Sequence, residues 1–267
     1  FTDKLYSELG MNYIVKKILK TENVYLNERL NKVTKNYDSL FELHFDSGLQ
    51  VTTEKLIITI PLPQAIEVLD ENHFLEWIQF SKPHSEYRPC LVIVEKWRKT
   101  RDYIFDALSK LPKFTFLDPG HDLEYISIES EKFKDGHNLC VMIQLGENFS
   151  KKHLENWIEP NKFPTDFAVN SSTELFNNFF KLYDIPVNTE ADFLRVHKWK
   201  YSQPINPLFE NLDYMDFDSD SWKNYISLYK KTGMALTADW VFGKRIINSA
   251  LGATILANEI KKIETLI

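Results

Sequence analysis

Residues 238–245 carry the clearest chemical signal in the sequence. They read Ala-Asp-Trp-Val-Phe-Gly-Lys-Arg, so Asp239 comes directly after an apolar strand predicted over residues 233–237, and a helix is predicted over residues 246–263. The start of a helix presents unpaired N–H groups and the positive end of the helix dipole. A carboxylate beside such a helix start predicts a site for an anionic or electron-rich group.

The same residues also have a purely structural interpretation. Asp239 can simply cap the turn, and small side chains in the following helix can let that helix pack closely on a neighbour. The small residues are Ser249, Ala250, Gly252 and Ala253. By themselves, residues 238–253 fit this structural interpretation at least as well as they fit a binding site.

A second group of side chains that could bind a ligand is aromatic. His197, Trp199 and Tyr201 are spaced by two, so they share one face of a strand. Rings on one face can form the wall of a pocket for a flat ligand, or they can belong to the core. We predict that Trp199 lines a substrate pocket.

The cysteines and histidines predict no metal centre. Cys90 and Cys140 lie in apolar, β-branched runs, so we expect buried strand residues with reduced thiols. The seven histidines show no i, i+2 or i, i+4 pair. The acidic run of residues 213–220 lacks the glycine and the final glutamate of a calcium loop.

Composition narrows the class of protein. The 267 residues are 43% hydrophobic and 14% aromatic, which is enough to fill a sizeable core. A net charge of -6 gives no basic surface for a phosphate backbone, so nucleic acid is excluded as the expected partner. No apolar run reaches the length of a membrane span, and residues 1–10 do not resemble a signal peptide. We therefore expect a soluble, cytoplasmic protein that does not bind membranes.

The two ends of the chain are predicted to be α/β. A helix is expected from Met11, where apolar residues recur at helical spacing, and a strand over residues 24–30. A hairpin is predicted over residues 40–53 around an Asp-Ser-Gly turn. Residues 56–60 are almost continuously apolar, which is typical of a parallel strand buried on both faces, and Pro61 ends it.

The middle of the chain has a different pattern. Short strands separated by charged loops predict a mostly antiparallel sheet with helices packed on it. The expected strands are residues 90–96, 125–129, 138–145 and 193–199, and a helix is expected over residues 172–182. One α/β domain interrupted by another domain is the simplest organisation of such a chain.

Five blocks, taken in order, resemble the renalase-like FAD-dependent oxidoreductases of the flavin amine-oxidase family. Each block is weak alone, and the order of the blocks carries the resemblance. The blocks are Gly10-Met11-Asn12 before a helix, residues 24–30, residues 56–64 with Pro-Leu-Pro-Gln, residues 197–204, and residues 238–245 with the small-residue helix.

The resemblance implies an α/β (α+β) fold, in which part of a Rossmann-like FAD-binding domain is interrupted by a mostly antiparallel substrate domain with helices. The implied boundaries place residues 1–71 and 232–267 in the FAD-binding domain, and residues 72–231 in the substrate-binding domain. His197, Trp199 and Tyr201 are then the predicted substrate pocket.

The resemblance also implies a non-covalent FAD. Asp239 would bind the ribityl chain, the amides near the start of the last helix would lie at the pyrimidine edge of the flavin, and the backbone of Leu30 would face the adenine. The implied cofactor-binding residues are Leu30, Asp239, Trp240, Arg245, Ile246 and Ile247. Leu30 can equally be an ordinary core leucine. Ala238 departs from the glycine usual in the family, and its methyl group could crowd the cofactor.

The implied activity is oxidation of a small reduced substrate, such as a dihydronicotinamide or an amine, with hydride passing to the flavin and then to oxygen. No general acid or base is evident, so the catalytic residues stay unassigned. These enzymes open with a Gly-x-Gly-x-x-Gly segment, which the 8 glycines here do not form, and the chain begins with Phe1. We expect an enzyme if that segment lies upstream. The alternative is a catalytically silent protein that binds a ligand or partner. The sequence decides neither the substrate nor the oligomeric state.

Overall fold

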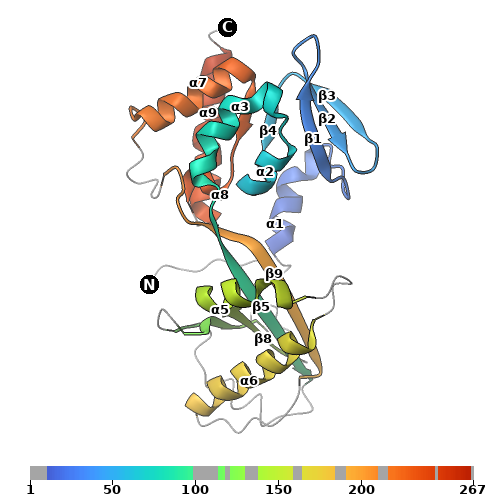
Figure 1. Ribbon diagram of the computed structural model, residues 1–267, viewed down its shortest axis with the longest axis vertical. Coiled ribbons are helices and arrows are strands. Elements are labelled where there is room, and N and C mark those ends of the chain that lie inside the picture. Colours follow the sequence, from blue (N-terminus) through green and yellow to red (C-terminus); the bar gives the residue numbers. More distant parts are fainter. Residues whose placement is uncertain are drawn as a thin grey trace. The chain divides into compact units, whose positions relative to one another are not determined.

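The computed structural model describes residues 11–98, 114–117, 121–129, 138–158, 164–183, 191–209, 216–243 and 246–265. The chain divides into two compact units, whose elements are labelled in Figure 1. Unit 1 comprises Phe1–Val24 and Pro89–Ser202, and unit 2 comprises Tyr25–Arg88 and Gln203–Ile267. Each unit has a hydrophobic core of its own.

Unit 1 is built on a five-stranded sheet in the order β6-β7-β8-β5-β9. Its three described strand pairings are antiparallel, as the sequence predicts for the middle of the chain. The strands are β5 (Tyr87–Arg98), β6 (Phe114–Phe116), β7 (Leu123–Ile128), β8 (Asn138–Leu145) and β9 (Phe193–Pro204). The helical segments are α1 (Met11–Ile18), η1 (Leu19–Thr21), α5 (Glu147–His153), η4 (Leu154–Asn156) and α6 (Asp166–Leu182).

One face of this sheet forms the core of unit 1. Ile93 on β5 is paired with Ile143 on β8, and both are fully buried. The Trp97 ring meets Phe176 of α6 edge to face, with ring centroids 5.4 Å apart. α6 begins at Thr165, whose side chain accepts a hydrogen bond from the Ala168 amide. Because successive side chains of a strand point to opposite faces, every second side chain on these strands faces away from this core.

Unit 2 contains a three-stranded antiparallel sheet and a two-stranded parallel sheet. The antiparallel sheet comprises β1 (Leu30–Lys35), β2 (Phe41–Phe45) and β3 (Gln50–Thr53), so the predicted hairpin is confirmed. Gly48 takes the positive φ of 89° that the turn between β2 and β3 requires. The predicted strand over residues 24–30 is wrong, because residues 23–29 are irregular and Asn27 has a left-handed φ of 63°.

The parallel sheet pairs β4 (Leu56–Ile58) with β10 (Met234–Leu236), and Ile57 lies opposite Ala235. The predicted parallel strand is therefore confirmed, but burial on both of its faces is not. Leu56 and Ile58 are buried, whereas Ile57 is 54% exposed. The two exposures differ because alternate residues of a strand point to opposite faces, and in the described chain the core covers one face of β4.

Among the described residues, six helical segments belong to the same unit as this parallel pair. They are α2 (Leu62–Val68), α3 (Glu71–Ser81), η2 (Lys82–His84), α7 (Asp220–Thr232), α8 (Asp239–Phe242) and α9 (Ile246–Glu264). α3 begins at Asp70, whose carboxylate accepts a hydrogen bond from the Asn72 amide. α7 ends at Gly233, whose left-handed φ of 74° turns the chain into β10. In the described residues no helix is both long and apolar enough to cross a membrane.

Aromatic side chains join α3 and α7 to the core of unit 2. The Trp77 ring lies edge to face with Tyr225 at 5.3 Å, and Trp222 stacks on Tyr225 at 5.6 Å. Residues 72–88, 203–209 and 216–231 therefore belong to unit 2, whereas the sequence-based boundaries placed them in the substrate domain. Residues 11–24, which those boundaries placed in the FAD-binding domain, belong to unit 1. These boundaries differ because periodicity predicts that a helix buries one face and leaves open which core receives it.

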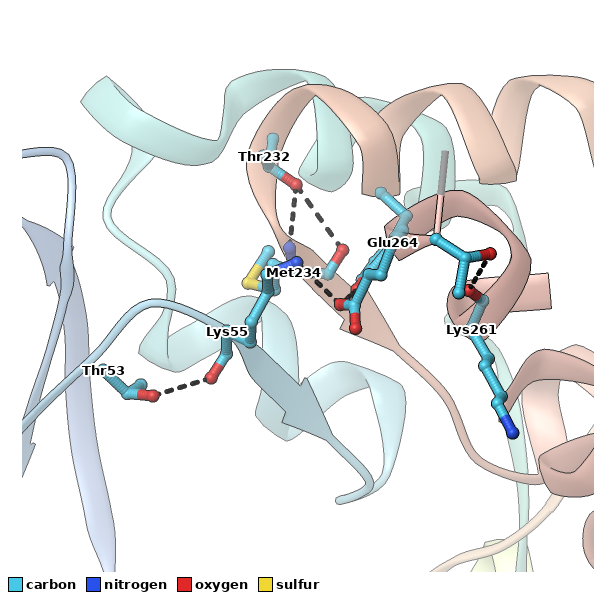
Figure 2. A network of polar contacts seen from close by, with 8 residues as sticks. Thr53, Lys55, Thr232, Met234, Lys261 and Glu264 are labelled. Atoms are coloured by element: carbon cyan, nitrogen blue, oxygen red, sulfur yellow. Dashed lines mark hydrogen bonds and ion pairs between the residues drawn. The ribbon is translucent and has the colours of Figure 1, made fainter. Parts of the chain in front are cut away.

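The amino ends of β4 and β10 are held by a polar network, shown in Figure 2. Lys55 Nζ lies 2.6 Å from Glu264 Oε1 near the end of α9, and the Tyr229 hydroxyl donates to the same oxygen at 3.0 Å. The Met234 amide donates to Thr232 Oγ1 at 3.1 Å. Side chains thus bind the two strands and two helices together at this end of the sheet.

Candidate functional site

A cavity of about 360 Å³ lies at the carboxyl ends of β4 and β10, within unit 2. The two segments remain joined beyond the paired residues, because the Thr237 amide donates to the Ile58 carbonyl at 2.8 Å. Ligands of open α/β sheets bind outside the carboxyl ends of the strands. The residues that line the cavity are Thr59, Pro61, Thr237, Ala238, Asp239, Ser249 and Ala253.

Asp239 supplies the carboxylate of this cavity. It is half-buried and begins α8, directly after the extended residue Ala238. Burial raises the pKa of the Asp239 carboxyl above its usual range, while hydrogen bonds from Tyr87 and from the amides of Asp239 and Trp240 act in the opposite direction. The Asp239 carboxylate is therefore a desolvated acceptor whose charge depends on its donors.

The side-chain donor to Asp239 is Tyr87, the first residue of β5. Its hydroxyl donates to Asp239 Oδ1 at 2.8 Å. The backbone amide of Leu62, at the start of α2, lowers the Tyr87 pKa. Burial is the largest of the effects that raise the pKa of Tyr87, so its hydroxyl remains a neutral donor. Sequence reasoning missed Tyr87, because no local pattern connects two residues that are 152 positions apart.

The first turns of α9 form another side of the cavity. Ser249 and Ala253 lie one turn apart on that helix and both line the cavity. Ile247 is 59% exposed, and Ile246 is the first helical residue. The predicted cofactor contact of Arg245 lies outside the described residues. Ser249 and Ala253 thus bring the early part of α9 to the same cavity as Asp239.

Gly252 allows α9 to pack closely on α8, as the structural interpretation proposes. A Cβ atom at this position would lie 2.1 Å from the Phe242 ring, so any side chain would force α8 and α9 apart. Ser249 and Ala253, by contrast, face the cavity. The two interpretations of these small residues therefore apply to different positions on α9.

Two of the predicted cofactor-binding residues lie in or against the core. Trp240 is 1% exposed, and its ring stacks on His84 with centroids 6.0 Å apart. The Trp240 carbonyl accepts a hydrogen bond from the Leu208 amide at 2.6 Å. Leu30 begins β1, is half-buried and packs against the core of unit 2.

The three predicted pocket residues lie together on β9. His197, Trp199 and Tyr201 share the face of the strand opposite Val196, which is buried in the core of unit 1. Trp199 is 57% exposed, so it lies outside that core. Burial, and to a lesser extent Arg195, lowers the pKa of His197, which favours a neutral imidazole.

The lining of the cavity is mostly apolar and carries a few polar groups. Thr59, Thr237 and Ser249 have hydroxyls that donate and accept, and the Asp239 carboxylate accepts. The volume lies within the usual range of small-molecule sites, which is about 300–1,000 Å³. A sugar-like chain with a polar ring near the α9 start fits these donors and acceptors. The ribityl chain and ring of a flavin have this chemistry.

Solved structures with the same fold cover nearly the whole chain. A candidate protoporphyrinogen oxidase from Exiguobacterium sp. 255-15 matches with a TM-score of 0.64 and 12% identity over 97% of this chain. Putrescine oxidase bound to putrescine matches with a TM-score of 0.54 and 11% identity over 93% of this chain. Reduced UDP-galactopyranose mutase matches with a TM-score of 0.53 and 11% identity over 86%. At these identities the likeness establishes the fold.

The chain spans about half the length of each of these structures, namely 51%, 53% and 46%. No protein-family model matches the sequence. No curated protein matches it either.

Proposed function

We propose that the chain belongs to an FAD-dependent oxidoreductase of the amine-oxidase type that oxidises a small reduced substrate. The observation that carries this proposal is the cavity at the carboxyl ends of β4 and β10, where Asp239 accepts a hydrogen bond from Tyr87. The fold supports it, because two of the structural neighbours are named as oxidases, a candidate protoporphyrinogen oxidase and putrescine oxidase. The order of the sequence blocks and the fold both support this proposal.

In this proposal, the cavity holds the flavin without a covalent bond. Asp239 accepts a hydrogen bond from a ribityl hydroxyl, and Ser249, which also lines the cavity, contributes a second one. The bound flavin supplies the hydride acceptor for the reaction. The N-terminal end of α9 stabilises negative charge on the ring system, because its first amides are unpaired within the helix. The lining carries hydroxyls and a carboxylate, which hold a ligand by hydrogen bonds.

We assign substrate binding to side chains of β9 in unit 1. Trp199 offers an exposed ring on which a planar substrate such as a dihydronicotinamide can stack, and Tyr201 lies on the same face. A neutral His197 would accept or donate a hydrogen bond without adding charge. A small amine is the other substrate that fits the class of enzyme. In either case these side chains orient the substrate and limit its contact with water.

The test is to purify the protein from its full reading frame and to measure flavin. We expect flavin absorbance that co-elutes with the protein, release of intact FAD on denaturation, and bleaching of the absorbance when a dihydronicotinamide or an amine is added without oxygen. Protein that stays colourless after incubation with excess FAD would contradict the proposal. That result would favour the alternative of a catalytically silent ligand- or partner-binding protein.

A further inference from the structure

We propose that Tyr87 is a positioning residue, which fixes the Asp239 carboxylate in place and keeps its remaining acceptor sites available to the ligand in the cavity. This inference rests on the proposed function for the identity of the ligand. The hydrogen bond on which it is built belongs to the protein itself. Tyr87 donates to Asp239 Oδ1 at 2.8 Å, and both residues lie in unit 2.

The start of α2 also acts on the Tyr87 hydroxyl. The backbone amide of Leu62 lowers the Tyr87 pKa, against the larger effect of burial. Pro61, immediately before Leu62, lines the cavity. The Tyr87–Asp239 hydrogen bond joins the first residue of β5 to the lining of the cavity just after β10.

The carboxylate retains capacity for a ligand. Two carboxylate oxygens offer about four acceptor sites. Tyr87 takes one site, and the amides of Asp239 and Trp240 contribute further hydrogen bonds. A carboxylate that is fixed in this way loses little freedom when a ligand hydroxyl binds to it, which favours affinity.

The electrostatic surroundings make Tyr87 the side chain that controls the charge on Asp239. Among the described residues, burial raises the Asp239 pKa, whereas the Tyr87 hydroxyl and two backbone amides lower it. His84 on the neighbouring η2 stacks on the Trp240 ring, and its Nδ1 donates to the Asn206 carbonyl oxygen at 2.8 Å. Removal of the Tyr87 hydroxyl should therefore raise the Asp239 pKa further.

The chain offers a matched control. Tyr229 also donates to a carboxylate, Glu264 Oε1 at 3.0 Å, at the amino end of the same parallel sheet. Tyr87→Phe and Tyr229→Phe each delete one phenol-carboxylate hydrogen bond in unit 2. The two deletions differ in that Asp239 lines the cavity.

The experiment measures FAD affinity and the Asp239 titration in protein from the full reading frame. We expect Tyr87→Phe to weaken FAD binding about tenfold and Tyr229→Phe to change it less than twofold. The Tyr87→Phe effect should vanish in an Asp239→Asn background, which a merely structural role would not produce. Equal affinity in Tyr87→Phe and the unchanged protein, or a full effect in the Asp239→Asn background, would overturn the proposal.

The Asp239 titration, followed by carboxyl carbon NMR without flavin, separates the two proposals. We expect its midpoint to be higher in Tyr87→Phe than in the unchanged protein. Protein that binds no FAD but shows this shift would refute the proposed function and retain the role of Tyr87. An unshifted midpoint would refute the role of Tyr87 whether or not FAD binds. If Tyr87→Phe does not fold, Tyr87→His, which keeps a ring donor, should restore both folding and the lower midpoint, and failure to restore that midpoint counts against the proposal.

Discussion

The Tyr87 hydroxyl donates a 2.8 Å hydrogen bond to Asp239 Oδ1 and so links the first residue of β5 to the first residue of α8. Asp239 is one of the residues that line the cavity, whereas Tyr87 is not among them. The acceptor that faces a ligand is thus backed by a neutral donor, an arrangement that maintains a carboxylate in a partly desolvated place.

Replacement of Asp239 by alanine should weaken FAD binding more than it lowers thermal stability. A hydrogen bond to a charged group contributes about 1.5–3 kcal/mol, which corresponds to roughly a tenfold to hundredfold loss of affinity. Fluorescence titration and thermal unfolding measure the two effects. Asp70→Ala is the control, because Asp70 caps α3 away from the cavity lining and should affect stability alone. Equal FAD affinity in Asp239→Ala and the unchanged protein would leave Asp239 with a structural role only.

Trp199→Phe should alter turnover and leave the denaturant midpoint nearly unchanged, because Trp199 is 57% exposed. Trp97→Phe is the matched control in the same unit. Trp97 is 1% exposed, and its replacement should cost about 1 kcal/mol or more through the cavity that it leaves. Steady-state rates and denaturant midpoints are compared for both variants. A large stability loss in Trp199→Phe, with unchanged rates per folded molecule, would contradict the pocket assignment.

Glu95→Gln should remove a pH dependence of stability. Glu95 is 4% exposed on the core face of β5, and burial raises its pKa from 4.5 to about 8. Between these values the unfolded chain loses the proton while the folded chain keeps it, so folding takes up a proton and stability falls as pH rises. Below pH 4.5 both states are protonated and this loss disappears.

Denaturant unfolding between pH 4 and pH 9 measures this effect. Glu95→Gln should match the unchanged protein near pH 4 and exceed it in stability near pH 8. Glu155→Gln is the control, because Lys198 lowers the pKa of the exposed Glu155 and any small effect has the opposite sign. Parallel pH profiles of Glu95→Gln and the unchanged protein would show that Glu95 ionises normally in the fold.

Gly252→Ala should destabilise unit 2, although glycine to alanine within a helix ordinarily stabilises by about 0.5–1 kcal/mol. The reason is the 2.1 Å distance from an added Cβ to the Phe242 ring. The free energy of unfolding should fall in Gly252→Ala and recover in part when Phe242→Leu is added, since the smaller side chain makes room. A gain in stability from Gly252→Ala alone would show that α8 and α9 can separate at little cost.

Local sequence patterns determined most of the secondary structure. Alternation and a turn signal predicted the hairpin of β2 and β3, and the apolar run of residues 138–145 coincides with β8. Helical spacing predicted α9, which ends within one residue of the expected position. These elements were predictable because neighbouring residues decide which side chains share a face. Asp239 was predictable as a candidate because it follows a strand and precedes a helix.

Tertiary structure alone decided which of these residues meet. Trp240 is adjacent to Asp239 in sequence but lies in the core, and Ile57 is exposed within an apolar strand. Tyr87 reaches Asp239 from 152 residues away, through a path in which the chain leaves unit 2 along β5 and returns to it along β9. Periodicity shows which side chains share a face over a few residues. A contact between residues so far apart in sequence depends on how the chain between them folds. The sequence therefore determined the carboxylate of the site, and the fold determined its partner.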